Sequence, residues 1–250
     1  MKKVLTLVAL VFAFVTAALT GLAQAGHEYA PLEEKTVNYK DWTLKSVKDD
    51  APINLRTFAK GKKLVLVVYF APWCGNWRNE APVAAKLYAK YKAHGLDVIG
   101  VSEYAPRADT VTFFGESGSP YTVVSESESR EDRDKTAHYG YRQATGDTRR
   151  WGSPYNVFLD PAKLNKTGDV LAEKAWVVNG ELIEDEVESF IRERLGLEKM
   201  DKKADVPTAT TSTTTPTTPA FVPETGKAKL LKATASSNSS SQTVQPCKEP

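Results

Sequence analysis

The chain has 250 residues, among them 33 Lys or Arg and 31 Asp or Glu, so its formal net charge is only +2. A charge this close to zero, without a cluster of basic residues, argues against nucleic acid as a binding partner. The two cysteines, Cys74 and Cys247, are too few for a disulfide scaffold, and the fold must therefore be stabilised by a buried apolar core.

The first 25 residues have the pattern of a secretory signal. Two lysines after Met1 are followed by an apolar run over residues 4–19 and by small residues that end at Ala25, where we expect cleavage. A retained membrane anchor is the alternative, but the run is shorter than the roughly 20 residues that cross a bilayer. We therefore expect an exported protein, periplasmic or extracellular, with no stable membrane anchor after signal cleavage.

The rest of the chain divides by composition into a domain and a tail. Residues 201–250 are rich in Thr, Ser and Pro, most densely over residues 208–219. Such a segment buries too little apolar surface to offset the entropy of the chain. We expect one domain over residues 26–200, with its packed part at about residues 37–197, and a disordered tail over residues 201–250.

The first strong patterns in the domain predict a βαβ unit. Residues 63–70 are a continuous apolar run rich in β-branched residues, typical of a strand buried on both faces. Apolar residues then recur at helical spacing over residues 75–94, and Gly95 ends the pattern as a C-cap glycine does. Residues 96–102 predict a second strand. A strand, a helix and a strand of these lengths form a right-handed crossover with parallel strands.

The remainder of the domain alternates further elements. We predict helices at residues 108–114, 130–139 and 184–195, strands at residues 121–124, 155–160 and 175–178, and a turn at Asn179-Gly180. Together the elements predict an α/β fold with a central mixed sheet, which has a parallel core and an antiparallel edge and carries helices on both faces.

A short motif directly follows the first predicted strand. It reads Trp73-Cys74-Gly75-Asn76-Trp77, with Glu80 and Pro82 beyond it. This segment resembles the W-C-x-x-C-x-x-E-x-P motif of the thioredoxin-like superfamily, and in particular of exported TlpA/ResA-type thiol-disulfide proteins in the AhpC/TSA-like redoxin group. Trp77 stands where that family has its second cysteine. The resemblance covers most of residues 37–197 and implies a thioredoxin-like fold with oxidoreductase or antioxidant activity.

Cys74 is the candidate catalytic residue, because it lies where a strand ends and a helix begins. Unpaired backbone N–H groups and the helix dipole stabilise an anion there, which lowers the pKa of a thiol and increases its thiolate fraction. The alternative is a buried structural cysteine. We expect an accessible thiol, because burial is unusual in a strand-to-helix turn with Pro72 before the cysteine and Gly75 after it.

Trp77 excludes the usual dithiol cycle, in which a second thiol one helical turn on attacks the mixed disulfide. Three possibilities remain: an external thiol resolves Cys74, Cys247 resolves it, or the site is redox-inactive. The tail is long enough on random-coil scaling for Cys247 to reach any part of the domain.

We expect a single-cysteine mechanism. A protein or small-molecule thiol or disulfide reacts at Cys74, or a peroxide is reduced there, and an external thiol reductant completes the cycle. The alternative function is a redox-inactive thioredoxin-fold module that binds an extended polypeptide.

The resemblance also assigns roles around the cysteine. Pro154, directly after Ser153, matches a cis-proline that faces the cysteine and leaves neighbouring backbone groups free to pair with an extended peptide. Glu80 matches a carboxylate that can exchange a proton with a thiol when its pKa is raised, and the alternative is a Glu that only interacts favourably with the dipole in the first turns of its helix. We expect Trp73 and Trp77 to form an apolar rim for a protein substrate, with packing inside the domain as the alternative for either residue.

Nothing in the sequence suggests a metal site or a cofactor. His27, His94 and His138 do not have the spacing of metal ligands, and we expect neither. Arg78, one helical turn after Cys74, is the candidate for orienting a peroxide, but no Thr precedes the cysteine at the spacing of peroxide-reducing sites. A solvated helix residue is the simpler interpretation of Arg78.

Overall fold

The structure is a computed structural model that describes residues 26–197 and Cys247. The predicted signal and the rest of the predicted tail lie outside the described residues. Within the part of the chain that is described, no helix has the length and apolar character needed to cross a membrane.

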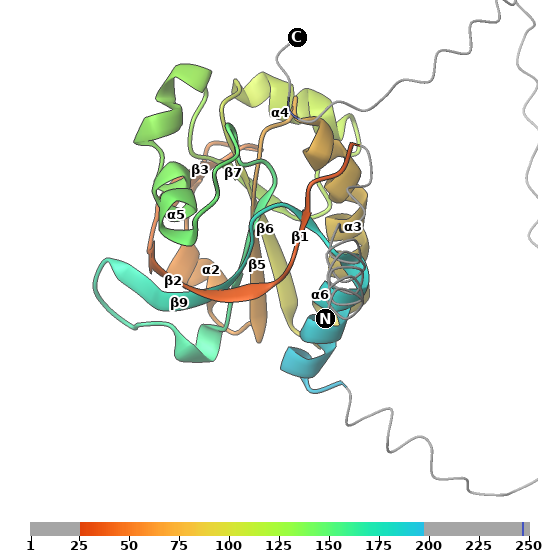
Figure 1. Cartoon of the computed structure of the whole chain (residues 1–250), viewed down its shortest axis with the longest axis vertical. Helices are drawn as coiled ribbons and strands as arrows, with labels where there is room; N and C mark the ends of the chain where they lie inside the picture. The colour runs from red at the N-terminus through yellow and green to blue at the C-terminus, as the bar shows by residue number, and fades with distance from the viewer. Residues whose placement is uncertain (1–25, 198–246, 248–250) are drawn as a thin grey trace, which may run out of the picture.

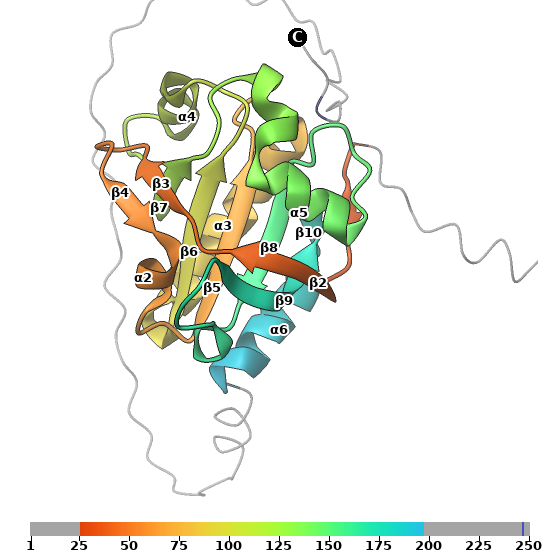
Figure 2. The ribbon, with the colours of Figure 1, turned by 90° about the vertical axis from the view of Figure 1, so that its left-hand side faces the viewer.

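A mixed sheet of eight strands forms the centre of the molecule, in the order β2-β9-β8-β5-β6-β7-β3-β4 (Figure 2). Strands β5, β6 and β7 are parallel neighbours, and the pairings of β8, β9, β2, β3 and β4 are antiparallel. The eight strands are β2 (Glu33–Lys40), β3 (Thr43–Ser46), β4 (Pro52–Asn54), β5 (Leu64–Phe70), β6 (Leu96–Ser102), β7 (Thr122–Ser125), β8 (Tyr155–Leu159) and β9 (Val170–Val178). The predicted mixed sheet with a parallel core is therefore confirmed.

Helices cover both faces of this sheet, as predicted. Figure 1 shows α3 and α6 on one side and α2 and α5 on the other. The helices are α2 (Leu55–Ala59), α3 (Gly75–Tyr91), α4 (Arg107–Phe114), α5 (Ala137–Thr145) and α6 (Glu184–Leu195), with short 3-10 helices η1 (Lys92–His94), η2 (Arg130–Lys135) and η3 (Pro161–Lys163). The β5-α3-β6 crossover, followed by the antiparallel β8 and β9 and by α6, is the thioredoxin-like arrangement.

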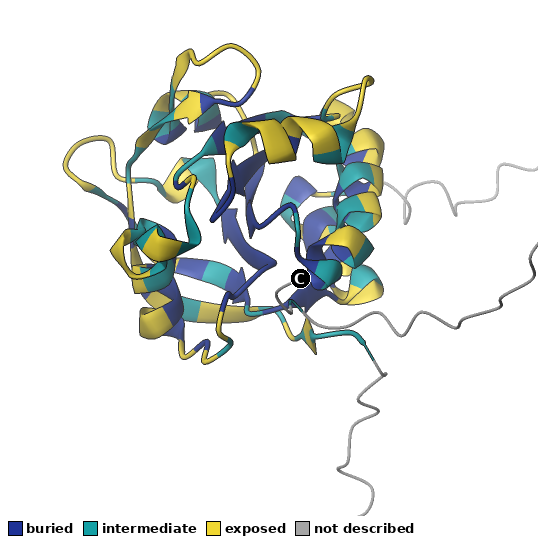
Figure 3. Ribbon diagram, turned by 90° about the horizontal axis from the view of Figure 1, so that it is seen from above, coloured by how far each residue is buried: buried dark blue, intermediate teal, exposed yellow. Residues whose placement is uncertain are grey.

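Strand β5 separates two apolar cores, because successive side chains of a strand point to opposite faces of the sheet. The even-numbered residues from Leu64 to Phe70 pack with α3 and α6. The odd-numbered residues from Val65 to Tyr69 pack with α2, α5 and β2. Every residue of β5 is buried, and Figure 3 shows buried strands at the centre between helices whose outer sides are exposed.

Several expectations about secondary structure were wrong. The charged helix predicted at residues 130–139 is two elements, because Thr136 caps α5 and accepts from the Tyr139 N–H at 3.0 Å. The chain does bend at Asn179-Gly180, as predicted, but β10 (Glu181–Leu182) beyond it pairs in parallel with β1 (Tyr29–Ala30) and does not return along β9. The packed part also begins earlier than residue 37, and β1 to β4 and α2 were not predicted.

Candidate functional site

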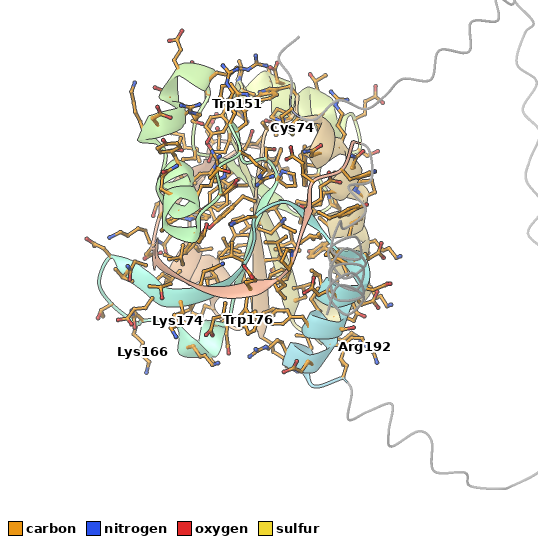
Figure 4. The ribbon with its side chains drawn as sticks, viewed as in Figure 1. Cys74, Trp151, Lys166, Lys174, Trp176 and Arg192 are labelled. Carbon is orange, nitrogen blue, oxygen red and sulfur yellow. A yellow bond between two sulfur atoms is a disulfide. The ribbon has the colours of Figure 1, made fainter. Side chains whose placement is uncertain are left out.

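Cys74 lies at the junction of β5 and α3. It is the N-cap residue of α3, and its carbonyl oxygen accepts from the Arg78 N–H at 3.2 Å. No side chain caps this helix, and no acidic residue lies in its first turn. The backbone N–H groups at this end of α3 therefore remain available to stabilise a negative charge on the sulfur. Figure 4 shows Cys74 at one end of the molecule.

Cys74 forms a disulfide with Cys247, with 4.6 Å between the Cα atoms across a sequence separation of 173 residues. Cys74 is completely buried, and Cys247 is half-buried against the same apolar core. The prediction of an accessible Cys74 thiol is wrong for this disulfide-bonded state, because the turn directs the side chain toward the core, where it is bonded to Cys247.

The loop before β8 faces the disulfide, as the resemblance implied. The Ser153–Pro154 peptide bond is cis. The Ser153 carbonyl oxygen lies 3.1 Å from Cys74 Sγ and 3.4 Å from Cys247 Sγ. Ser153 Oγ accepts from the Ala71 N–H at 2.9 Å, which fixes this loop to the end of β5. In the reduced protein, the same carbonyl oxygen can accept the proton of either thiol.

Trp77 does not contribute to a substrate-facing rim. Its side chain is fully buried, its ring stacks on Phe70 with 4.3 Å between centroids, and Phe113 lies 5.7 Å away. A side chain in the first turn of α3 points back toward the preceding strand, and this one fills the core beside β5. The rim prediction for Trp77 is wrong, and the alternative of packing inside the domain is confirmed.

Trp73 lies at the half-buried edge of the site. Its Nε1–H donates to the Tyr104 carbonyl oxygen at 3.1 Å, and its ring meets Trp151 edge to face at 5.2 Å. The guanidinium of Arg130 lies 4.1 Å from the Trp73 ring centroid. The sequence analysis missed Trp151 and Arg130. The position of Trp151 directly before Gly152-Ser153-Pro154 was the available signal for one of them.

Glu80 is buried in the second turn of α3. Its Oε2 accepts from the Asn156 side chain at 3.1 Å and from the Leu182 N–H at 2.8 Å, while Oε1 has no hydrogen-bond partner among the described residues. Burial raises the pKa of Glu80 to about 8, although the bonds from Leu182 and Asn156 oppose the shift. Glu80 also lines a cavity of about 530 Å³ together with Asn79. The carboxyl is thus poised to gain or lose a proton near neutral pH.

Arg78 and the histidines, which the sequence analysis also considered, lie outside the group of residues around Cys74. Arg78 is exposed and its guanidinium lies 5.9 Å from the Phe113 ring centroid, as expected for a solvated helix residue. His27 is paired with Glu181 at 2.8 Å, and His138 is buried against Tyr104. Within residues 26–197 and at 247, no three His, Cys, Asp or Glu side chains are grouped so that they could hold a metal ion.

Comparison with known proteins gives one family match and several distant similarities. The AhpC/TSA family model matches residues 37–163, just over half of the chain. A curated Caenorhabditis elegans protein named "Probable protein disulfide-isomerase A4" is 34% identical over 94 residues, which are 37% of this chain and 14% of that protein. The chain therefore spans only a small part of the length of this relative.

Solved structures with a similar arrangement include two thiol-disulfide proteins. A thiol:disulfide interchange protein of the thioredoxin family from Chlorobium tepidum has a TM-score of 0.44 and 19% identity, covering 63% of this chain and 95% of that one. A secreted disulfide oxidoreductase of Mycobacterium tuberculosis has a TM-score of 0.42 and 17% identity, covering 63% of this chain and 96% of that one.

Proposed function

This chain belongs to the AhpC/TSA family, and we propose that it is an exported thiol-disulfide oxidoreductase whose redox pair is Cys74 and Cys247. The observation that carries the proposal is the disulfide between these two residues. Trp77 occupies the position of the second cysteine in the family motif and packs in the core. The second sulfur is supplied instead by the C-terminal segment.

Oxidation of the pair transfers two electrons to a substrate disulfide. The Cys74 thiolate attacks one substrate sulfur, forms a mixed disulfide and releases the other substrate sulfur as a thiolate. The Cys247 thiolate then attacks Cys74 Sγ and releases the second substrate thiolate, which leaves the Cys74–Cys247 disulfide. Two equivalents of an external thiol reduce this disulfide and complete the cycle. This proposal replaces the expected single-cysteine mechanism with the alternative in which Cys247 resolves Cys74, and it retains the expected external thiol as the reductant of the disulfide.

The surroundings of the two sulfurs favour a direction for the reduction step. Cys247 is half-buried and Cys74 is fully buried, so an incoming thiolate reaches Cys247 Sγ more easily. Attack there expels the Cys74 thiolate, which the free N–H groups of α3 stabilise. A stabilised thiolate is a faster leaving group, and the same property makes Cys74 the attacking residue in the next cycle.

Two features support an exported disulfide oxidoreductase over the other sequence-based alternatives. Disulfides persist in oxidising compartments outside the cytoplasm, which is consistent with the signal-like pattern of residues 1–25. Disulfide exchange is favoured over peroxide reduction because Arg78, the candidate for orienting a peroxide, is exposed over Phe113. A module that only bound polypeptides would not need a sulfur pair.

The test is the fate of a mixed disulfide in the mature chain. Purified wild type and Cys247→Ser are reduced, mixed with a disulfide-containing peptide, and analysed by intact mass under non-reducing conditions. We expect wild type to release reduced peptide and to lose two hydrogens, whereas Cys247→Ser retains one peptide half on Cys74. Cys74→Ser is the control and should do neither. A wild-type protein that accumulates the same stable adduct as Cys247→Ser would contradict a resolving role for Cys247.

A wild type that forms no adduct and reduces no peptide would favour the redox-inactive binding module. A parallel reaction with hydrogen peroxide tests peroxide reduction.

A further inference from the structure

Three arginines gather on two tryptophans at the edge of the candidate site. Arg130 lies 4.1 Å from the Trp73 ring centroid and 5.9 Å from that of Trp151. Arg133 and Arg150 lie 5.8 Å and 5.2 Å from the Trp151 ring centroid. These five residues are called the arginine rim below. They come from η2, from the turn before α3 and from the loop before β8.

The rim borders the disulfide. Trp73 directly precedes Cys74 in the chain, and Trp151 is two residues before Ser153, whose carbonyl oxygen lies within 3.4 Å of both sulfurs. Figure 4 places Trp151 and Cys74 at the same end of the molecule, whereas Arg192 lies at the far end. Trp73, Trp151 and both cysteines also belong to the same apolar cluster, so the rim lies on the same side of the molecule as the disulfide.

Arg130 differs from its neighbours on this edge in its ion pairing. Arg133 is paired with Asp134, and Lys135 with Asp132. No ion-pair partner of Arg130 is found among residues 26–197 and 247. The exposed Glu128 and Glu131 are the other acidic residues next to it in sequence.

The position of Arg130 over the Trp73 ring suits it to bind a ligand. A guanidinium stacked on an aromatic ring keeps its N–H edge available, and this planar edge matches the two oxygens of a carboxylate. The ring beneath it is itself fixed, because the Trp73 Nε1–H donates to the Tyr104 carbonyl oxygen at 3.1 Å. Stacking on a fixed ring reduces the entropy that Arg130 loses when it binds a ligand.

We propose that Arg130 binds a carboxylate carried by the thiol or disulfide that exchanges with the Cys74–Cys247 pair, and that the protein therefore prefers acidic sulfur substrates. This inference rests on the proposed function and specifies its substrate class. In the reduction step, the carboxylate contacts Arg130 while the thiolate of the same molecule attacks Cys247 Sγ. The new sulfur-sulfur bond forms as the Cys74–Cys247 bond breaks, and the electron pair leaves on Cys74.

The experiment compares reductants that differ in charge. The oxidised full mature chain is treated with 3-mercaptopropionate, 2-mercaptoethanol or cysteamine, and second-order rates are expressed per thiolate. We expect 3-mercaptopropionate to react about 10-fold faster than 2-mercaptoethanol at low salt, and cysteamine to react more slowly than either. The preference should shrink in high salt, which screens exposed charges.

Variants assign the effect to Arg130. Arg130→Gln should lose the preference for the acid, so that the rates with 3-mercaptopropionate and 2-mercaptoethanol become equal, and Arg130→Lys should restore part of the preference. Arg192→Gln, at the opposite end of the molecule, is the matched control and should behave as wild type. Circular dichroism and the rate with the neutral thiol show that each variant is folded.

A second pair of probes identifies the source of the carboxylate. Two cysteine peptides that differ only by Glu or Gln beside the cysteine are used as reductants. If only the Glu peptide is preferred over its neutral counterpart, the site binds acidic polypeptides. If only 3-mercaptopropionate is preferred, the site binds small acidic thiols. If both are preferred, the site accepts a carboxylate from either source. Equal rates for acidic and neutral probes would overturn the inference but leave the proposed function intact. Failure of every thiol to open a Cys74–Cys247 disulfide would instead contradict the proposed function.

Discussion

The two faces of β5 hold different kinds of core. Toward α3 and α6, the core is mostly aliphatic side chains with Phe and Trp rings and three buried tyrosines, and Glu80 lies buried beside it. Toward α5 and β2, the core contains a group of buried tyrosines around His138. The hydroxyl oxygens of Tyr39 and Tyr69 are hydrogen-bonded at 2.5 Å. The Tyr69 ring stacks on the His138 ring with 4.8 Å between centroids.

Burial raises the pKa of tyrosines on both faces, including Tyr104 and Tyr121 on the α3 side, and the difference lies in the buried carboxyl of Glu80. Burial raises the pKa of Tyr39 and of Tyr69 well above the ordinary tyrosine value, and it lowers the pKa of His138 well below the ordinary histidine value. These groups therefore stay neutral and hydrogen-bonded at physiological pH. Glu80, in contrast, is brought by burial into the range where it titrates. The comparison therefore sets a buried carboxyl that titrates near pH 8 on the α3 side against tyrosines and a histidine that stay neutral on the other side.

The largest expected effect concerns Trp77 and would test whether the family's second cysteine can simply be restored. Trp77→Cys removes a fully buried ring that packs on Phe70 and Phe113. We expect it to lower the free energy of unfolding by about 4 kcal/mol, since the core cannot fill a cavity of that size. Denaturant unfolding under reducing conditions measures the change. Trp176→Cys, at a half-buried ring, should cost less, and equal stability of Trp77→Cys and wild type would contradict the account.

The second largest effect is the pH dependence of the free energy of unfolding that the buried Glu80 should cause. Glu80 is neutral in the folded protein up to about pH 8 but ionises in the unfolded chain near pH 4.5, so the folded state binds more protons between these values. The free energy of unfolding should therefore fall as pH rises, by about 3 kcal/mol between pH 5 and pH 7.5. Glu80→Gln should remove this part of the slope.

The control for the pH measurement is Glu188→Gln. The hydrogen bond from Lys90 lowers the pKa of Glu188, so this residue is ionised in the folded state and mostly ionised in the unfolded chain across the window, and its replacement should change the slope very little. Parallel slopes for wild type and Glu80→Gln would show that Glu80 does not titrate in the range given by its burial.

The smallest effect belongs to the tyrosine face. Tyr39→Phe leaves the buried Tyr69 hydroxyl and the Trp42 indole N–H without the oxygen that they contact at 2.5 and 3.3 Å. We expect a loss of about 1.5 kcal/mol in thermal unfolding, with no change in thiol exchange at Cys74. Tyr155→Phe is the matched control, because its hydroxyl has a weaker contact, at 3.3 Å to Thr145. A change in the exchange rate of Tyr39→Phe would mean that the two faces are coupled.

The elements that could be predicted are those in which one physical signal dominates. Strand β5 is a continuous apolar run, and α6 (Glu184–Leu195) has its apolar residues on one face, so both were placed correctly. Strand β2 could not be placed, because it lies at the edge of the sheet and only Val37 and Tyr39 are buried in it. The break at Thr136 depends on a capping bond that competes with the charged helical pattern.

The site divides in the same way. Cys74 and Pro154 stand at positions of the family motif. The resemblance was therefore enough to predict that the loop with Pro154 faces Cys74. The burial of Trp77 depends on the shape of the space beside Phe70, and the approach of Arg130 to Trp73 depends on how η2 is oriented. Neither packing relation is encoded by local spacing, so neither could be derived from the sequence.

The most direct test of the central claim is a redox titration of the full mature chain. The protein is equilibrated with thiol-disulfide buffers of graded potential, alkylated, and digested for mass spectrometry. The account predicts one two-electron transition, in which the linked Cys74–Cys247 peptide disappears as both alkylated cysteines rise together. Alkylation of Cys74 and Cys247 at separate potentials, with no linked peptide at any point, would contradict it.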